Sequence, residues 1–202
     1  MKIQERRARE RGFTLIEMLV VLVILGIAAL ISIPYLSAQI QRSKLLGVTS
    51  QVSGLMRLAR LDAIKYSRCG MVAINLSTRK VNAFSDKDGD CQPDAGEEIG
   101  EVILPKSVIF GAPGNVCNLT GVATYQGFSP WAGNPNVATF NSDGSIKDST
   151  GAFCFKSEAL GTGAPNYLEV QVAPQATARV AMLKYESGAW VENDGTGVWK
   201  WN

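Results

Sequence analysis

Five acidic side chains in the segment 86–97 have the spacing of a calcium-binding loop. Positions 1, 3, 5, 9 and 12 of this segment are held by Asp86, Asp88, Asp90, Asp94 and Glu97. Carboxylate oxygens at this spacing can wrap around Ca²⁺, which takes about six to eight hard oxygen ligands. The sixth position normally needs glycine for a sharp turn, but here it is Cys91. Two interpretations therefore stay open, a Ca²⁺ site and a solvated acidic turn of the kind that Asp and Gly favour.

The chain has four cysteines, none of them in a C-x-x-C pair: Cys69, Cys91, Cys117 and Cys154. An even number of cysteines in an exported domain indicates two disulfides. Of the three pairings we favour Cys69–Cys91 and Cys117–Cys154, because neighbours along the chain often become neighbours in antiparallel sheets. The alternative is a set of free buried thiols, which export disfavours.

The residue types argue against an enzyme. Histidine, the commonest general base and zinc ligand, is absent. The sequence has no G-x-S-x-G nucleophile motif, no glycine-rich phosphate loop and no pair of carboxylates with catalytic spacing. We therefore expect a non-enzymatic protein that needs no cofactor, apart from Ca²⁺ if the acidic loop binds it.

One carboxylate, Glu17, lies near the start of an otherwise apolar segment at 13–33. The only other polar residues of these 21 are Thr14 and Ser32. At about 1.5 Å per residue, a helix of this length matches the roughly 30 Å hydrocarbon core of a bilayer. A charge inside a membrane span is costly and indicates a function by default. The alternative is an acid that reaches out of the membrane edge into water.

Basic charge is concentrated before this apolar segment. The whole chain of 202 residues has a net charge of +2, but residues 1–12 alone carry +3. Basic flanks stay in the cytoplasm, so the C-terminal part should lie outside. A secretory signal has a similar start, and "LSA" at 36–38 offers a small-residue cleavage site. The near-neutral remainder gives no general reason to expect a nucleic-acid partner.

The segment 35–66 has the pattern of an amphipathic helix, and we expect the helix to continue through Pro34 to about Tyr66. Its apolar stripe consists of Ile40, Leu45, Val48, Val52, Leu55, Met56, Ala59 and Ala63. The opposite faces are mostly basic, which indicates a solvated surface. The stripe should pack against a sheet.

Short strands are predicted for the remainder, 67–202. The segments 71–76 and 80–85 flank a hairpin turn. Further strands are predicted at 98–104, 107–111, 121–127, 136–141, 151–157, 167–173, 177–186 and 189–192. The fold class is therefore α+β, a long N-terminal helix on an antiparallel β-sheet head.

Several aromatic residues fall in Gly- and Pro-rich segments near the end of the chain. They are Tyr125, Phe128, Trp131, Trp190, Trp199 and Trp201. Exposed aromatics can form a contact surface for a partner. The interpretation that we favour is that they pack back on the sheet.

The stretch "RGFTLIEMLVVLVILGI" at 11–27 closely resembles the N-terminal signal of type IV pilins and type II secretion pseudopilins. This resemblance implies that prepilin peptidase removes the leader 1–12 by cutting between Gly12 and Phe13, and that Phe13 is then N-methylated. It implies that 13–34 forms a membrane helix that later lies in a filament core. It also implies that Glu17 pairs there with the N-terminal amine of a neighbouring subunit, since a buried charge is tolerable when paired.

The head resembles GspH/FimT-type minor pilins in "LARLDAIKYSRCGMVAINL", "FSDKDGDCQPDAGEEI" and "ATFNSDGSIKDSTGAFCF". The resemblance implies a pilin-like fold and a structural subunit near the filament tip, with other pilins and an inner-membrane assembly platform as partners. It implies an inner-membrane protein with a periplasmic head, later part of a filament. Some relatives bind DNA through a Gly-Arg-x-Arg tail, but this chain ends "GTGVWKWN". The alternative function is a membrane-anchored module that binds DNA or another ligand.

Overall fold

The computed structural model describes residues 13–111, 117–119, 122–124, 137–147, 151–160, 166–186 and 188–192. For 117–119, 122–124 and Pro34 it describes the backbone alone. The chain divides into two compact units, Met1–Gln39 and Ile40–Asn202, and the boundary falls inside a helix.

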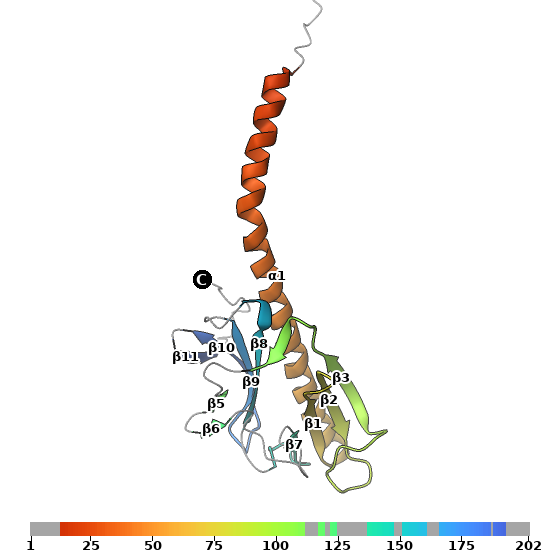
Figure 1. The fold of residues 1–202 in the computed structure, drawn as a ribbon. Coiled ribbons are helices and arrows are strands. Elements are labelled where there is room, and N and C mark those ends of the chain that lie inside the picture. The colour runs from red at the N-terminus through yellow and green to blue at the C-terminus, as the bar shows by residue number, and fades with distance from the viewer. Residues whose placement is uncertain are drawn as a thin grey trace, which may run out of the picture. The chain divides into compact units, whose positions relative to one another are not determined.

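A single long helix, α1, runs from Leu15 to Tyr66 and passes through Pro34 (Figure 1). Its part in the first unit exposes nearly every apolar side chain, among them Leu15 at 85% and Leu30 at 75%. By length and composition α1 is the one helix among the described residues that could cross a membrane. An apolar surface of this size is stable only in hydrocarbon or against other apolar surfaces.

In the second unit, one stripe of α1 enters the core of the head. Seven of the eight predicted stripe positions are buried: Leu45, Val48, Val52, Leu55, Met56, Ala59 and Ala63. The prediction was wrong for Ile40, which is 46% exposed. Ile40 is the first residue of this unit, and the periodicity that marks a stripe does not show where the packing surface ends. The buried face also contains Thr49, whose hydroxyl tolerates burial because it donates to the Leu45 carbonyl oxygen over 2.8 Å.

The head contains two main sheets in which every strand pair is antiparallel. The first has the order β3-β2-β1-β7, from β1 (Gly70–Asn75), β2 (Lys80–Ser85), β3 (Glu98–Ile103) and β7 (Val137–Phe140). The second has the order β11-β10-β9-β8-β4, from β4 (Val108–Phe110), β8 (Gly151–Ser157), β9 (Tyr167–Val172), β10 (Val180–Glu186) and β11 (Ala189–Glu192). A short 3-10 helix at Glu158–Leu160 follows β8. The predicted α+β fold with antiparallel sheets is confirmed.

The strand predictions hold with two differences. The hairpin of β5 (Cys117–Leu119) and β6 (Val122–Thr124) includes a strand, β5, that was not predicted. Strand β6 lies within the strand predicted at 121–127, of which 121 and 125–127 lie outside the described residues. The strand predicted at 177–186 begins only at Val180. A turn occupies the preceding residues, in which the Ala178 N–H donates to the Pro174 carbonyl over 2.8 Å and Ala178 has a φ of 41°.

One hydrophobic core joins residues 40–66 of α1 to both sheets. It contains Val52 and Met56 of the helix, Val72 and Ile74 of β1, and aromatic and aliphatic residues of the second sheet such as Phe153, Phe155 and Leu168. Figure 1 shows the two sheets on either side of this part of the helix. The helix is thus the centre of the head, and burying its stripe orders both sheets.

Strand β1 approaches α1 so closely at Gly70 that no side chain fits. A Cβ there would overlap the carbonyl oxygen of Ala59, which is backbone and cannot swing away. We expect Gly70→Ala to lower the free energy of unfolding by about 2 kcal/mol, a typical cost of overpacking. Denaturant titration of the full chain in detergent micelles measures this change.

The control for this prediction is Gly54→Ala on an exposed turn of the same helix. A Cβ at Gly54 meets no atom within 4 Å, and alanine is the better helix former. We expect Gly54→Ala to raise the free energy of unfolding by up to about 1 kcal/mol. A Gly70→Ala variant as stable as the wild type would show that the helix and the strand can move apart.

Candidate functional site

The first turn of α1 is closed by reciprocal hydrogen bonds between Thr14 and Glu17. The Glu17 backbone N–H donates to Thr14 Oγ1 over 3.3 Å, and the Thr14 backbone N–H donates to Glu17 Oε2 over 2.9 Å. The Thr14 hydroxyl also donates to Glu17 Oε2, over 3.0 Å. Because α1 begins at Leu15, Thr14 is the N-cap and Glu17 the third helical residue, which is the arrangement of a capping box.

This capping role of Glu17 was missed in the sequence analysis, although the signal was present. Thr-x-x-Glu directly before an apolar run is the signature of a capping box. Its carboxylate satisfies an N–H group that the start of a helix leaves without an intrahelical partner, and the helix dipole favours a negative charge there. Glu17 therefore has a structural role within its own chain, in addition to any contact with a neighbouring subunit.

Gly12 and Phe13 flank the predicted cleavage site directly before the capping box. Phe13 is described and is 79% exposed. Gly12 and the leader 1–12 lie outside the described residues. Cleavage between Gly12 and Phe13, N-methylation of Phe13, and the pairing of Glu17 with a neighbour's amine stay predictions.

The acidic loop connects β2 to β3 and is fastened to the C-terminal end of α1. Ser85 N–H donates to the Glu97 carbonyl over 2.9 Å, and Asp86 N–H donates to the Cys69 carbonyl over 3.1 Å. The Ser85 hydroxyl donates to Asp62 of α1, which also forms an ion pair with Arg68. These bonds fix both ends of the loop on the first sheet and the helix.

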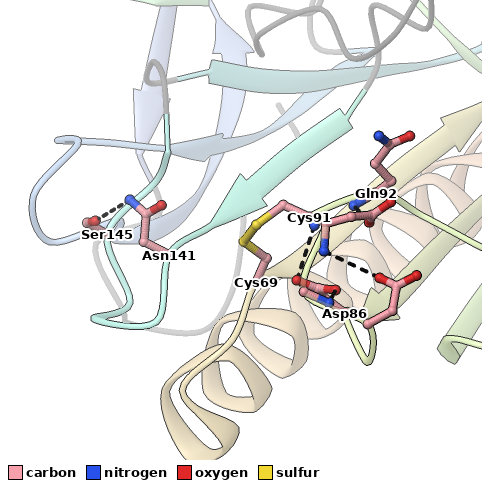
Figure 2. Close-up of a disulfide and its surroundings, with 9 residues drawn as sticks. Cys69, Asp86, Cys91, Gln92, Asn141 and Ser145 are labelled. Carbon is pink, nitrogen blue, oxygen red and sulfur yellow. Dashed lines mark hydrogen bonds between the residues drawn. A yellow bond between two sulfur atoms is a disulfide. The ribbon is translucent and has the colours of Figure 1, made fainter.

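The predicted Cys69–Cys91 disulfide is confirmed, with a Cα–Cα distance of 5.3 Å (Figure 2). It joins the residue before β1 to the sixth position of the acidic loop. Cys91 has a φ of 57°, the left-handed conformation that glycine adopts with the least strain. The cysteine therefore provides the turn for which glycine was expected, and it cross-links the loop as well.

The five predicted acids of this loop are all described, and they lie close together. One oxygen each of Asp86, Asp88 and Glu97 lies within 4.8 Å of the others, and the same is true of Asp88, Asp90 and Asp94. Burial and the nearby charges of Asp88, Asp94 and Asp86 raise the pKa of Asp90, although a backbone hydrogen bond from Gln92 acts against them. The loop thus concentrates negative charge, as a cation site would.

The second predicted disulfide is only partly described. Cys154 of β8 is disulfide-bonded, and the side chain of its predicted partner, Cys117, lies outside the described residues. Cys154 Sγ lies 3.5 Å from Oε2 of Glu169, a fully buried acid on the neighbouring strand. Burial raises the pKa of Glu169 to about 8, so this carboxyl group holds its proton at neutral pH.

Among the predicted aromatic residues, Trp190 of β11 packs back on the second sheet. Its ring lies 5.3 Å from that of Tyr185, edge to face, and it covers Ala152 and Cys154. This agrees with the favoured interpretation for Trp190. The others, Tyr125, Phe128, Trp131, Trp199 and Trp201, lie outside the described residues.

A basic groove lies between α1 and the start of β10, lined by Arg57, Arg60 and Arg179 among others. Two of these guanidinium groups already have partners. Arg60 Nε donates to the Gly144 carbonyl over 2.8 Å, and Arg179 forms an ion pair with Glu192. The groove therefore does not favour an anion-binding function.

Comparison with known proteins supports the N-terminal motif. Residues 7–33 match the family model described as the prokaryotic N-terminal methylation motif. The methylation motif predicted from the sequence is thereby confirmed, as a match over this segment of the chain. In sequence, no curated protein matches the chain.

Two solved structures are similar to the chain. One is the minor pseudopilin EpsH from the type 2 secretion system of Vibrio cholerae, at 12% identity and a TM-score of 0.45, covering 70% of this chain and 97% of that one. The other is the type IV minor pilin FimU of Pseudomonas aeruginosa strain PAO1, at 11% identity and a TM-score of 0.47, covering 74% of this chain and 94% of that one.

Proposed function

We propose that this chain is a minor pilin or pseudopilin, a non-enzymatic structural subunit of a type IV pilus or of a type II secretion pseudopilus. The observation that carries the proposal is the match of residues 7–33 to the N-terminal methylation motif. The fold supports it, since a long helix with an exposed apolar first part leads into a disulfide-bonded β-sheet head.

In this proposal the apolar part of α1 has two successive environments. It first anchors the chain in the inner membrane, with the head in the periplasm, because the basic residues before it stay in the cytoplasm. Prepilin peptidase then cuts after Gly12, and the assembly platform transfers the subunit to the filament, at or near its tip. There the exposed apolar surface is covered by the same segment of neighbouring pilins.

Glu17 controls this transfer through its charge. Its carboxylate accepts hydrogen bonds from Thr14 and is therefore oriented before assembly. Oε1 makes no hydrogen bond among the described residues, so it is available to a cation. Cleavage creates that cation as the amine of Phe13 on a neighbouring subunit. A charge pair in an apolar core is tolerated only when both partners are present, so the pair selects the correct register.

The mass of the mature chain tests this proposal. We expect co-expression with prepilin peptidase to remove residues 1–12 and to add the mass of one methyl group to Phe13. Intact-protein mass spectrometry and N-terminal fragment ions measure both changes. The controls are cells without the peptidase and the variant Gly12→Leu, which should stay uncut.

A different N-terminus would contradict the proposal. A cut after Ala38 would indicate an ordinary secretory signal and an exported domain. An uncut chain in the presence of an active peptidase would indicate a plain membrane anchor, and it would favour the alternative function of an anchored binding module.

A further inference from the structure

The acidic loop between β2 and β3 brings carboxylate oxygens together at a separation that a metal ion could bridge. Oxygens of Asp86, Asp88 and Glu97 lie within 4.8 Å of one another, and Asp88 also belongs to the group with Asp90 and Asp94. Oxygen ligands of Ca²⁺ lie about 2.3–2.6 Å from the ion, so two ligands on opposite sides of it are about 5 Å apart. The separation of these carboxylates therefore suits ligands that share one ion.

Glu97 gives the independent indication of a ligand. Glu97 is buried, with only 5% of its surface exposed. Oε1 accepts the Lys87 backbone N–H over 2.6 Å, but Oε2 is buried and has no hydrogen-bond partner. A buried carboxylate oxygen without a donor costs free energy, and the Glu97 carboxylate has an oxygen within 4.8 Å of oxygens of Asp86 and Asp88. A cation between Glu97, Asp86 and Asp88 would remove this cost.

Asp86 is oriented by backbone hydrogen bonds that leave its oxygens able to accept a metal. It is 2% exposed, and its two oxygens accept the backbone N–H groups of Gly89, over 2.7 Å, and Cys91, over 3.1 Å (Figure 2). These bonds fix the carboxylate in one orientation. Each oxygen keeps a second lone pair, so both can still act as ligands.

The charge of the loop is not neutralised by its own side chains. Throughout the described part of the chain, no ion pair involves any of its five acids. The ammonium group of Lys87 donates to the Gly96 carbonyl oxygen instead. An external cation is therefore the partner that this arrangement lacks.

We propose that the loop from Asp86 to Glu97 binds one Ca²⁺ ion, with Asp86, Asp88 and Glu97 as the central ligands. Asp90 and Asp94 group with Asp88 and add negative charge beside these ligands. The spacing is that of an EF-hand loop, here carried by two strands in place of two helices. This site is independent of the proposed filament function.

The donor atoms favour calcium over other metals. Cys69 and Cys91 lie beside Asp86, but their sulfurs are joined in a disulfide and offer no thiolate to a soft metal. The remaining donors are hard oxygens, which suit Ca²⁺ and Mg²⁺. Mg²⁺ demands near-ideal octahedral geometry and keeps several waters, whereas a loop with many carboxylates suits the larger and more adaptable Ca²⁺ shell.

Bound calcium would join three parts of the head. The loop is the connection of β2 and β3, and its Cys91 is bonded to Cys69 just after α1. An ion that holds Asp86 and Glu97 together would close the base of the loop, where Ser85 and Glu97 already pair through their backbones. We therefore expect the ion to stabilise the folded head.

The test is calorimetric titration of the full chain in detergent micelles, after removal of metal with EGTA. We expect one equivalent of Ca²⁺ to bind and saturating Ca²⁺ to raise the melting temperature by about 5 °C or more. Glu97→Gln should weaken Ca²⁺ binding at least about tenfold, because it removes one charged ligand and keeps the shape. The matched control is Glu98→Gln, which removes an exposed charge from the next residue and should change the affinity less than about twofold.

Three results would overturn the proposal. The first is that Ca²⁺ produces neither heat of binding nor a shift in melting temperature. The second is that Glu98→Gln loses as much Ca²⁺ affinity as Glu97→Gln, and the third is that Mg²⁺ binds and stabilises the chain as strongly as Ca²⁺ does. If circular dichroism shows that Glu97→Gln is misfolded, Asp88→Asn replaces it, because Asp88 is exposed and belongs to both carboxylate groups. An Asp88→Asn variant that binds Ca²⁺ as tightly as the wild type would also overturn the proposal.

Discussion

Glu17→Gln is expected to leave the chain in the membrane but to prevent its incorporation into filaments. Glutamine can serve in a capping box, so the first turn of α1 stays closed. It carries no charge, so the amine of a neighbouring subunit would be buried without a partner. Loss of one partner from a buried ion pair costs about 3–5 kcal/mol, which corresponds to a decrease in incorporation of at least about a hundredfold. Immunoblots of sheared filaments measure incorporation, and immunoblots of membrane fractions measure the amount of chain in the membrane.

Two further variants separate the charge of Glu17 from its capping role. Thr14→Ala keeps the charge but removes the N-cap hydroxyl, at a cost of about 0.5–2 kcal/mol to the helix, and should still assemble. Glu17→Ala removes both and should not assemble. If Glu17→Gln assembles like the wild type while Glu17→Ala does not, the residue acts through the helix cap and the charge-pair hypothesis is wrong.

Glu169→Gln is expected to make the head more stable at neutral and alkaline pH. In the folded chain, burial raises the pKa of Glu169 from the ordinary 4.5 to about 8. The unfolded chain therefore releases this proton at a lower pH than the folded chain does. This difference lowers the free energy of unfolding of the head. The loss is absent below about pH 4.5, grows as the pH rises, and is constant above about pH 8. At pH 7 it amounts to about 3 kcal/mol, at about 1.4 kcal/mol per pH unit.

Denaturant unfolding between pH 5 and pH 8 checks this expectation. The difference in stability between Glu169→Gln and the wild type should grow with pH, because glutamine has the same shape and no proton to lose. The control Glu158→Gln, at an exposed position close to the same strands, should show no such growth. A constant difference across this range would show that Glu169 ionises at its ordinary pKa in the folded head.

Patterns that repeat along the sequence predicted the fold well. The helical stripe from Leu45 to Ala63 and the strands of both sheets follow from periodicity, because a buried face requires apolar residues at regular spacing. Features set by a few atoms were harder to predict. Periodicity does not encode where neighbouring elements end. Three features depend on such ends: the exposure of Ile40, the start of β10 at Val180 and the three-residue strand β5.

The candidate sites show the same division. The motif around Phe13 and Glu17 and the acidic spacing from Asp86 to Glu97 could be read directly from the residue types. The orphaned Oε2 of Glu97 could not, because it depends on which donors the folded backbone brings near. The burial of Glu169 could not be predicted either, because the sequence of a short strand does not show whether other parts of the chain pack on the face that carries the acid.

The left-handed conformation of Cys91 leaves this position little room to vary. Glycine would adopt the same backbone at lower strain but would lose the link to Cys69, and serine would lose the link and keep the strain. Any single replacement therefore loses the disulfide to Cys69, and any replacement other than glycine also keeps the backbone strain. A lineage that abandons the cross-link should change both cysteines together, with glycine the favoured successor in the loop.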